Sequence, residues 1–217
     1  MGRSVSSMSV ALFGGTFNPV HFGHLNLANH LADYLQVESV RMIPCAIPPH
    51  REAPNVSAEQ RLAMLQLAID DQPSLVSDDL ELRKNSPSYS IETIQQIRQQ
   101  VGDDKPLFFC MGMDSLLTID HWHRWDELLD DCHLAISPRP GYDLPNKGDL
   151  AEWIEHNKCD DFDRVKKRSR GYLHLCKIPL KDISSTAIRD SIKCAKSIDH
   201  LAPKSVVNYI KQHSLYE

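Results

Sequence analysis

The sequence predicts an α/β protein in which a parallel sheet carries helices on both faces. Short apolar runs alternate along the chain with segments whose apolar residues recur every three or four positions. The composition, 41% hydrophobic and 24% charged, lies near the average for soluble globular chains. The 217 residues suffice for a sizeable core, so we expect one domain over residues 10–217 after a disordered leader, residues 1–9.

Two glycines join the first predicted strand to the first predicted helix. Residues 10–13 are apolar and lead into Gly14 and Gly15, which predicts a buried strand that ends in a turn. The helix that follows has apolar residues at helical spacing, namely Phe22, Leu25, Ala28, Ala32 and Leu35. Residues 40–43 predict a second strand, which ends at Pro44 before a proline-rich loop.

The middle of the chain predicts two more helices and three more strands. Ser57 and Gln60 fit a capping box, and the inner face of the helix that they open would include Leu62, Leu65 and Ile69. A further helix ends before Gly102, with its apolar face at Ile91, Ile94, Ile97 and Val101. The remaining strands are the apolar runs at residues 106–112, 133–137 and 172–178.

Residues 142–171 interrupt this alternation, because they are polar and poorly periodic. Their basic run, "RVKKRSR", could contact phosphates, but a solvated loop is the better interpretation. The chain then closes with helical patterns, one of which starts at Pro203, and these predict a small C-terminal helical segment.

Charge and composition exclude several classes of protein. The formal net charge of −5 argues against a dedicated nucleic-acid binder, whose affinity depends on many basic contacts to phosphates. No apolar run approaches the roughly 18 to 20 residues of a membrane helix, and the first residues lack the apolar core of a secretory signal. The six cysteines are scattered without a C-x-x-C pair, which favours buried reduced thiols in a cytoplasmic protein.

Gly14, Gly15 and Thr16 would lie at the carboxyl end of the first strand, where open parallel sheets bind ligands. Glycine allows backbone N–H groups to approach a phosphate, and a helix N-terminus adds partial positive charge. His21 and His24 would lie one turn apart on the next helix and could donate hydrogen bonds to the same phosphate.

Ordinary packing explains these residues about equally well at this point. A histidine near a helix start is usually structural or exposed, and zinc generally needs three or four ligands, whereas H-x-x-H supplies two. The cluster "HWHRW" at residues 121–125 has no carboxylate or cysteine at metal spacing. No metal site is therefore predicted on the protein itself.

A second candidate anion site favours the phosphate interpretation. Ser184 or Ser185 is a natural N-cap for a helix that follows the last predicted strand. Ser185 and Thr186 would then present hydroxyls and backbone amides at the helix N-terminus, with the cation of Arg189 one turn further along.

These segments resemble a known family. "GGTFNPVHFGHL" resembles the (H/T)-x-G-H signature of the nucleotidylyltransferase superfamily, and "ISSTAIR" resembles its second signature. "IPPHR", "SPSYSIETI", "MGMDSLL" and "HWHRWDELL" further match, in order, the bacterial nicotinate-nucleotide adenylyltransferases, from about Ala11 to the end of the chain. The resemblance implies a Rossmann-like sheet. It also implies that ATP, with Mg²⁺, adenylylates nicotinate mononucleotide by direct in-line attack, giving nicotinate adenine dinucleotide and pyrophosphate for NAD biosynthesis.

The resemblance also implies roles for individual residues. The catalytic residues would be His21, His24 and Arg189. Residues at the ATP side would be Gly14, Gly15, Thr16, Phe17, Gly112, Asp114, Ser185, Thr186 and Arg189. Residues at the mononucleotide side would be His50, Arg51, Tyr89, Ser90, Trp122 and His123. Trp122 would stack on the pyridine ring, although a half-buried core aromatic explains it almost as well.

One position departs from the family pattern, because His123 stands where a tyrosine is frequent. Two alternatives also stay open. A pantetheine-phosphate adenylyltransferase is the nearest alternative enzyme, but such chains are usually shorter and lack the "SPSYS" and "HWHRW" stretches. A noncatalytic nucleotide sensor is the alternative from another class, although it would not need to retain His21, His24, Thr186 and Arg189 together. The oligomeric state is left open.

Overall fold

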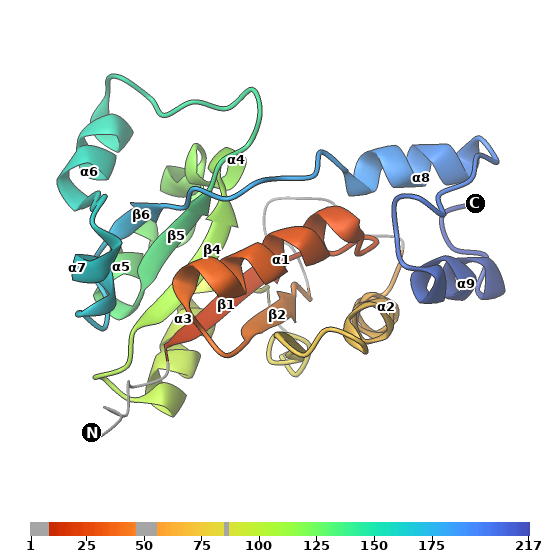
Figure 1. The fold of residues 1–217 in the computed structure, drawn as a ribbon, viewed down its shortest axis with the longest axis horizontal. Coiled ribbons are helices and arrows are strands. Elements are labelled where there is room, and N and C mark those ends of the chain that lie inside the picture. The colour runs from red at the N-terminus through yellow and green to blue at the C-terminus, as the bar shows by residue number, and fades with distance from the viewer. Residues whose placement is uncertain (1–8, 47–55, 85–86) are drawn as a thin grey trace.

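The computed structural model describes residues 9–46, 56–84 and 87–217. Its six strands are β1 Val10–Gly15, β2 Val40–Pro44, β3 Leu75–Ser77, β4 Leu107–Gly112, β5 His133–Ser137 and β6 Leu173–Leu175. They form one sheet in the order β3-β2-β1-β4-β5-β6, and every neighbouring pair is parallel. The predicted parallel sheet is confirmed (Figure 1). The predicted leader lies, apart from residue 9, outside the described residues.

Nine α-helices are found in the described part of the chain. They are α1 Phe22–Leu35, α2 Ala58–Ile69, α3 Ser90–Val101, α4 Met113–Leu116, α5 Leu128–Asp131, α6 Asp149–Asn157, α7 Phe162–Lys166, α8 Ser185–Lys193 and α9 Lys204–Gln212. Two 3₁₀ turns, Ile119–His121 and Trp125–Glu127, precede α5. None of the helices in the described ranges is long and apolar enough to cross a bilayer.

Helices cover both faces of the sheet, as predicted. Along β1, Ala11 and Phe13 point into one hydrophobic cluster, whereas Leu12 between them points into another. The first cluster takes its helical residues mainly from α1, α2, α8 and α9, and the second mainly from α3, α4 and α5. Figure 1 shows α8 and α9 together at the end of the molecule remote from α6 and α7.

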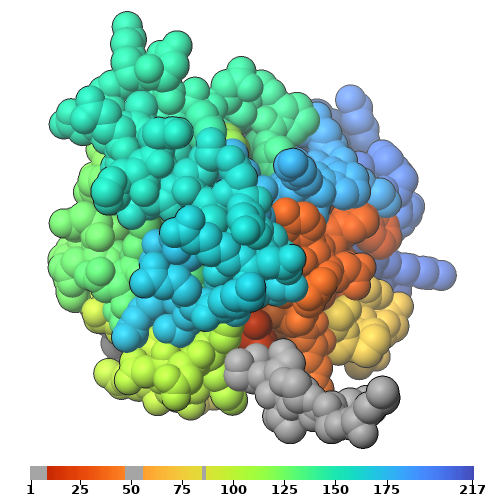
Figure 2. Space-filling view, turned by 60° about the vertical axis from the view of Figure 1, so that its left-hand side comes forward, coloured from red at the N-terminus to blue at the C-terminus, as the bar shows by residue number. Residues whose placement is uncertain are grey.

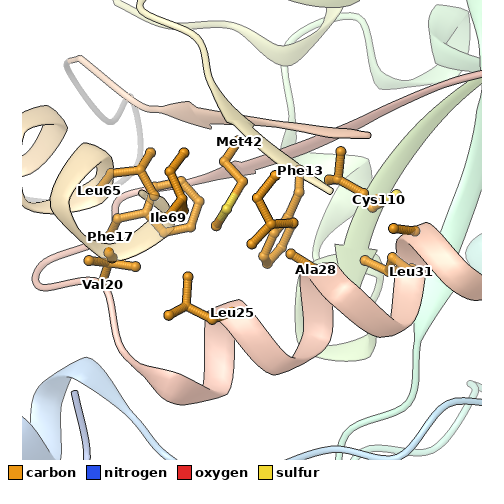
Figure 3. Packing of buried hydrophobic residues seen from close by; sticks show 14 of the residues in the cluster. Phe13, Phe17, Val20, Leu25, Ala28, Leu31, Met42, Leu65, Ile69 and Cys110 are labelled. Carbon is orange, nitrogen blue, oxygen red and sulfur yellow. The ribbon is translucent and has the colours of Figure 1, made fainter. Parts of the chain in front are cut away.

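The turn that follows β1 is anchored to α2. Phe17 and Val20 are almost fully buried, and Figure 3 shows them beside Leu65 and Ile69 of that helix. Burying a side chain of this size stabilises the fold by about 1.5–3 kcal/mol, so the turn is fixed by packing before any ligand is considered.

The polar segment over residues 142–171 is partly helical, and its basic run at residues 164–170, which was interpreted as a solvated loop, begins inside α7. The segment contains α6 and α7, and Figure 2 shows it packed against the molecule. Ile154 is buried, and the Trp153 ring packs edge-on against Trp125 with centroids 5.0 Å apart. The basic run is also packed locally, because the guanidinium groups of Arg164 and Arg168 both lie over the Tyr172 ring.

Smaller details differ from the prediction. On α2 the buried charged residue Arg61 occupies the inner face, and Leu62 is only half-buried. The edge strand β3 was not predicted, and β6 is shorter than the apolar run at residues 172–178. Four cysteines are buried as expected, but Cys194 is exposed.

Candidate active site

A cleft of about 990 Å³ opens where the carboxyl ends of β1 and β4 meet. From β1 the chain continues to β2 and β3 on one side of the sheet, whereas β4, β5 and β6 lie on the other side of β1. The strand order therefore switches direction between β1 and β4. Open α/β sheets bind ligands at such a point, and the volume lies within the range of small-molecule sites.

The cleft brings together all the predicted site residues that the structure describes. They are Gly14, Gly15, Thr16, Phe17, His21, His24, Tyr89, Ser90, Gly112, Asp114, Trp122, His123, Ser185, Thr186 and Arg189. His50 and Arg51 lie outside the described residues. Sequence segments more than 160 residues apart therefore line one cleft.

His21 and His24 form a stacked pair at the start of α1. His21 is the N-cap of the helix, and its Nδ1 accepts a hydrogen bond from the His24 backbone N–H at 3.3 Å. The two rings are 3.7 Å apart between centroids and are inclined by 23°. Because Nδ1 of His21 accepts, a neutral His21 ring carries its proton on Nε2, where it can be donated.

Both histidines are held in the neutral form. Burial, followed by the nearby positive charge of Arg139, lowers the pKa of His21 to about 4. Burial, followed by the charges of His21 and Arg139, lowers the pKa of His24 well below its ordinary value. At neutral pH the pair therefore offers hydrogen-bond donors rather than a positive charge, which suits phosphate oxygens that gain charge during a reaction.

Position 23, between the two histidines, has no room for a side chain and is occupied by glycine. A Cβ at this position would stand 2.9 Å from Cε1 and Nδ1 of His21, and 3.3 Å from the backbone oxygen of Ile183. The glycine therefore allows the His21 ring to pack directly against the backbone of α1.

The start of α8 forms the second predicted anion site. Ser184 is its N-cap, and the hydroxyl accepts from the Ala187 N–H at 3.1 Å. The Ser185 hydroxyl donates its one proton to the Pro19 carbonyl at 3.0 Å, so the backbone N–H is the donor that this residue retains. The Thr186 hydroxyl accepts from Arg189 Nη2 at 3.2 Å and keeps its own proton for donation.

The turn over residues 16–19 is held through its carbonyl groups. Arg61 Nη1 donates to the Thr16 oxygen at 2.7 Å, and Arg189 Nη1 donates to the Asn18 oxygen at 2.8 Å. Arg61 is only 1% exposed, and its Nη2 also donates to the Ala46 oxygen at 3.1 Å. The sequence analysis missed Arg61, although a charge on the apolar face of a predicted helix was a usable signal.

Asp114 is paired with a second residue that the sequence analysis missed. Arg139 follows β5, and its Nη1 donates to Asp114 Oδ2 at 2.5 Å. A Cβ on Gly112 would stand 2.5 Å from Asp114 Oδ1, so only glycine leaves this carboxylate in place. The position of Arg139 shortly after an apolar strand, where ligand-binding residues gather, was the signal for it.

Aromatic side chains line the other end of the predicted site. The rings of Tyr89 and His123 are 4.5 Å apart between centroids, at 40°. Trp122 is half-buried and packs edge-to-face against Phe109, with centroids 6.5 Å apart. Trp122 therefore both packs against the core and faces the cleft. Ser90 begins α3, so the N-terminus of a third helix reaches the same cleft.

Glu81 is a buried carboxyl group at the cleft wall that the sequence analysis also missed. Its Oε1 accepts from the Thr93 hydroxyl at 2.8 Å, and burial raises its pKa. Across the described ranges, no group of three or more His, Cys, Asp or Glu side chains is arranged to hold a metal ion.

The chain is similar over most of its length to several known proteins. The family model described as cytidylyltransferase-like matches residues 12–191. A Serratia proteamaculans (strain 568) protein named "Probable nicotinate-nucleotide adenylyltransferase" is 43% identical over 95% of this chain and 94% of its own length. A Salmonella gallinarum protein of the same name is 41% identical over 95% of this chain and 97% of its own length.

A solved structure shares the fold. The Plasmodium falciparum nicotinic acid mononucleotide adenylyltransferase complexed with NaAD superposes with a TM-score of 0.72. At 15% identity it covers 96% of this chain and 97% of its own. The family model and the curated relatives extend over most or nearly all of the sequence. The chain therefore belongs to the cytidylyltransferase-like family, among the nicotinate-nucleotide adenylyltransferases.

Proposed function

We propose that this chain transfers the adenylyl group of ATP to nicotinate mononucleotide, giving nicotinate adenine dinucleotide and pyrophosphate in NAD biosynthesis. The observation that carries the proposal is the meeting of two helix N-termini, those of α1 and α8, in one cleft beside a neutral histidine pair. The names of the curated relatives, 43% and 41% identical over almost the whole chain, support the choice of substrates.

The reaction needs positioning and charge stabilisation rather than a protein nucleophile. An oxygen of the mononucleotide phosphate attacks the α-phosphorus of ATP in line. The bond from that phosphorus to the bridging oxygen breaks, and pyrophosphate leaves with the electron pair. The site supplies backbone N–H groups, neutral imidazoles, hydroxyls and a guanidinium group, which are suited to hold two phosphates in line and to stabilise the growing charge.

Each end of the phosphate chain has its own donors. In this proposal His21 and His24 donate from Nε2 to phosphate oxygens at the reacting centre. The backbone N–H of Ser185, the Thr186 hydroxyl and the remaining N–H groups of Arg189 bind the leaving pyrophosphate. Arg189 also holds the Asn18 carbonyl, so its guanidinium group is already oriented before ATP binds.

Mg²⁺ fits this site as a partner of ATP rather than as a resident metal. The described residues form no acidic cage, and the Asp114 carboxylate is already paired with Arg139. Mg²⁺ commonly binds through substrate phosphates and keeps several waters. We therefore expect MgATP to be the form that binds, with the ion neutralising part of the triphosphate charge.

The pyridine ring is assigned to the aromatic end of the cleft. Trp122 would stack on the ring, and the N-terminus of α3 at Ser90, together with the backbone at His123, would provide N–H donors to the nicotinate carboxylate. His50 and Arg51 would lie near the mononucleotide phosphate, as the family resemblance implies.

The test is to mix the purified chain with ATP, Mg²⁺ and nicotinate mononucleotide and to measure pyrophosphate release, with the dinucleotide identified by mass. A His24→Ala preparation controls for contaminating enzymes, because it should release pyrophosphate far more slowly. Release that requires pantetheine phosphate instead would support the alternative enzyme. ATP binding without release, with either second substrate, would support the sensor.

A further inference from the structure

The segment after α9 brings a tyrosine hydroxyl back to the turn that follows β1. Tyr216 Oη donates to Asn18 Oδ1 at 2.7 Å, although the two residues are 198 positions apart in the sequence. Asn18 lines the cleft, and its backbone oxygen accepts from Arg189. Asn18 is therefore held at both its side chain and its backbone, by partners from two different segments.

The backbone of this segment is shaped to deliver the hydroxyl. Ser214 and Tyr216 have φ values of 47° and 70°, in the left-handed region that residues with side chains rarely adopt. Such conformations persist only where the surroundings hold them. Leu215 between them is 8% exposed, packs into the core and donates its N–H to the Ile210 oxygen at 3.0 Å.

The surroundings of Tyr216 also suit a donor. Burial raises the pKa of Tyr216, so the hydroxyl stays protonated at neutral pH. Arg61 and Arg189, which bind the Thr16 and Asn18 carbonyls, both lie near enough to act electrostatically on Tyr216. The hydroxyl thus adds a third donor to the turn, beside those of Arg61 and Arg189.

We propose that Tyr216 is a positioning residue of the ATP side of the site, acting through Asn18 on the turn over residues 16–19. The inference rests on the proposed function. The mononucleotide end of the cleft, around Tyr89 and Trp122, is formed by other elements. Among the described residues, no hydrogen bond joins it to the segment after α9. The effect of losing the hydroxyl should therefore fall on ATP and not on the mononucleotide.

The test compares Tyr216→Phe with the wild-type protein by calorimetric titration with MgATP and with nicotinate mononucleotide. We expect affinity for MgATP to fall about threefold to tenfold, the range for one neutral hydrogen bond, while affinity for the mononucleotide changes less than twofold. Tyr209→Phe is the matched control, because Tyr209 lies on α9, packs on the core and should leave both affinities unchanged.

A second arm tests the route through Asn18. Asn18→Ala removes the acceptor, and adding Tyr216→Phe to it should cause no further loss of MgATP affinity. Additive losses, an unchanged MgATP affinity in folded Tyr216→Phe, or equal losses for both ligands would each overturn the inference. Should Tyr216→Phe fail to fold, comparison of Asn18→Ala with the wild-type protein for the two ligands decides it.

The inference and the proposed function fail separately. A wild-type chain that binds MgATP but releases no pyrophosphate contradicts the proposed function, and the affinities still test Tyr216. A wild-type chain that releases pyrophosphate, with variants that bind MgATP normally, contradicts the positioning role alone.

Discussion

Adding one methyl group at Gly23 should impair catalysis far more than stability. In Gly23→Ala the new Cβ would stand 2.9 Å from two atoms of the His21 ring, where carbon atoms normally stay about 3.5–4.0 Å apart. The methyl group cannot move away from the ring, because the Ile183 oxygen is 3.3 Å away from it. The His21 ring must therefore shift by roughly 0.6–1 Å, relative to that contact range.

A displacement of this size at a group that we assign to the reacting phosphate should lower kcat by about tenfold to hundredfold. The free energy of unfolding should change much less, since alanine is favoured over glycine inside a helix by up to about 1 kcal/mol, which offsets part of the contact strain. The hydrogen bond from the His24 N–H to His21 Nδ1 should weaken at the same time.

The assay is pyrophosphate release at saturating substrates, with urea unfolding measured on the same samples. Asp33→Ala is the control, because Asp33 lies on the exposed side of α1 and should leave kcat unchanged. A folded Gly23→Ala protein with wild-type kcat would refute the argument that the His21 position matters for catalysis. So would a loss of kcat that merely follows a loss of folded protein.

Burial holds the pKa of both His21 and His133 at about 4 in the folded protein, against 6.5 ordinarily, so the unfolded chain takes up protons first as the pH falls. The two histidines should therefore make their whole contribution to the free energy of unfolding above about pH 6.5. That contribution should fall by up to about 3 kcal/mol for each histidine as the pH drops toward 4. Urea unfolding at several pH values measures this, and a flat profile would contradict it. Arg189→Ala should weaken MgATP binding by tenfold or more, because it removes a charged hydrogen bond worth about 1.5–3 kcal/mol. The affinity for the mononucleotide should stay nearly intact. If calorimetry finds the loss of affinity on the mononucleotide alone, the assignment of Arg189 to ATP is wrong. Nicotinate mononucleotide should be preferred over nicotinamide mononucleotide by at least about tenfold to hundredfold in kcat/KM, because an amide NH₂ would face N–H donors without an acceptor. Trp122→Ala should weaken both substrates and keep most of that preference, and equal kcat/KM values for the two substrates would show that the pocket does not read the carboxylate.

The sequence alone predicted those elements whose signals lie within a few residues. The capping box at Ser57 and Gln60 and the end of α3 at Gly102 are local features, and both are present. The strand β3 has three residues, of which only Leu75 is buried, so it carries almost no pattern. Helix α6 was missed although Leu150, Trp153 and Ile154 stand at helical spacing, because the sequence on both sides of it is polar.

The same distinction between local and distant signals applies to the residues of the candidate site. Residues next to the glycine turn and the two helix starts could be identified from short motifs. Arg61, Arg139 and Tyr216 could not be assigned in the same way, because each acts on a residue at least 25 positions away in sequence. A local pattern could mark Arg61 and Arg139 as candidates, but their partners depend on how the sheet brings distant segments together.

The order in which the chain is synthesised determines when the turn over residues 16–19 can acquire its hydrogen-bond partners. The turn belongs to the first strand–helix unit, yet its partners Ser185, Arg189 and Tyr216 lie 166, 171 and 198 positions from the residues that they contact. A nascent chain that has already exposed β1 and α1 still lacks all three. Because closing such distant contacts is slow, nucleotide binding should mature only after residues 185–216 have been synthesised and have docked on this turn. A chain that ends before α8 would then bind ATP only weakly.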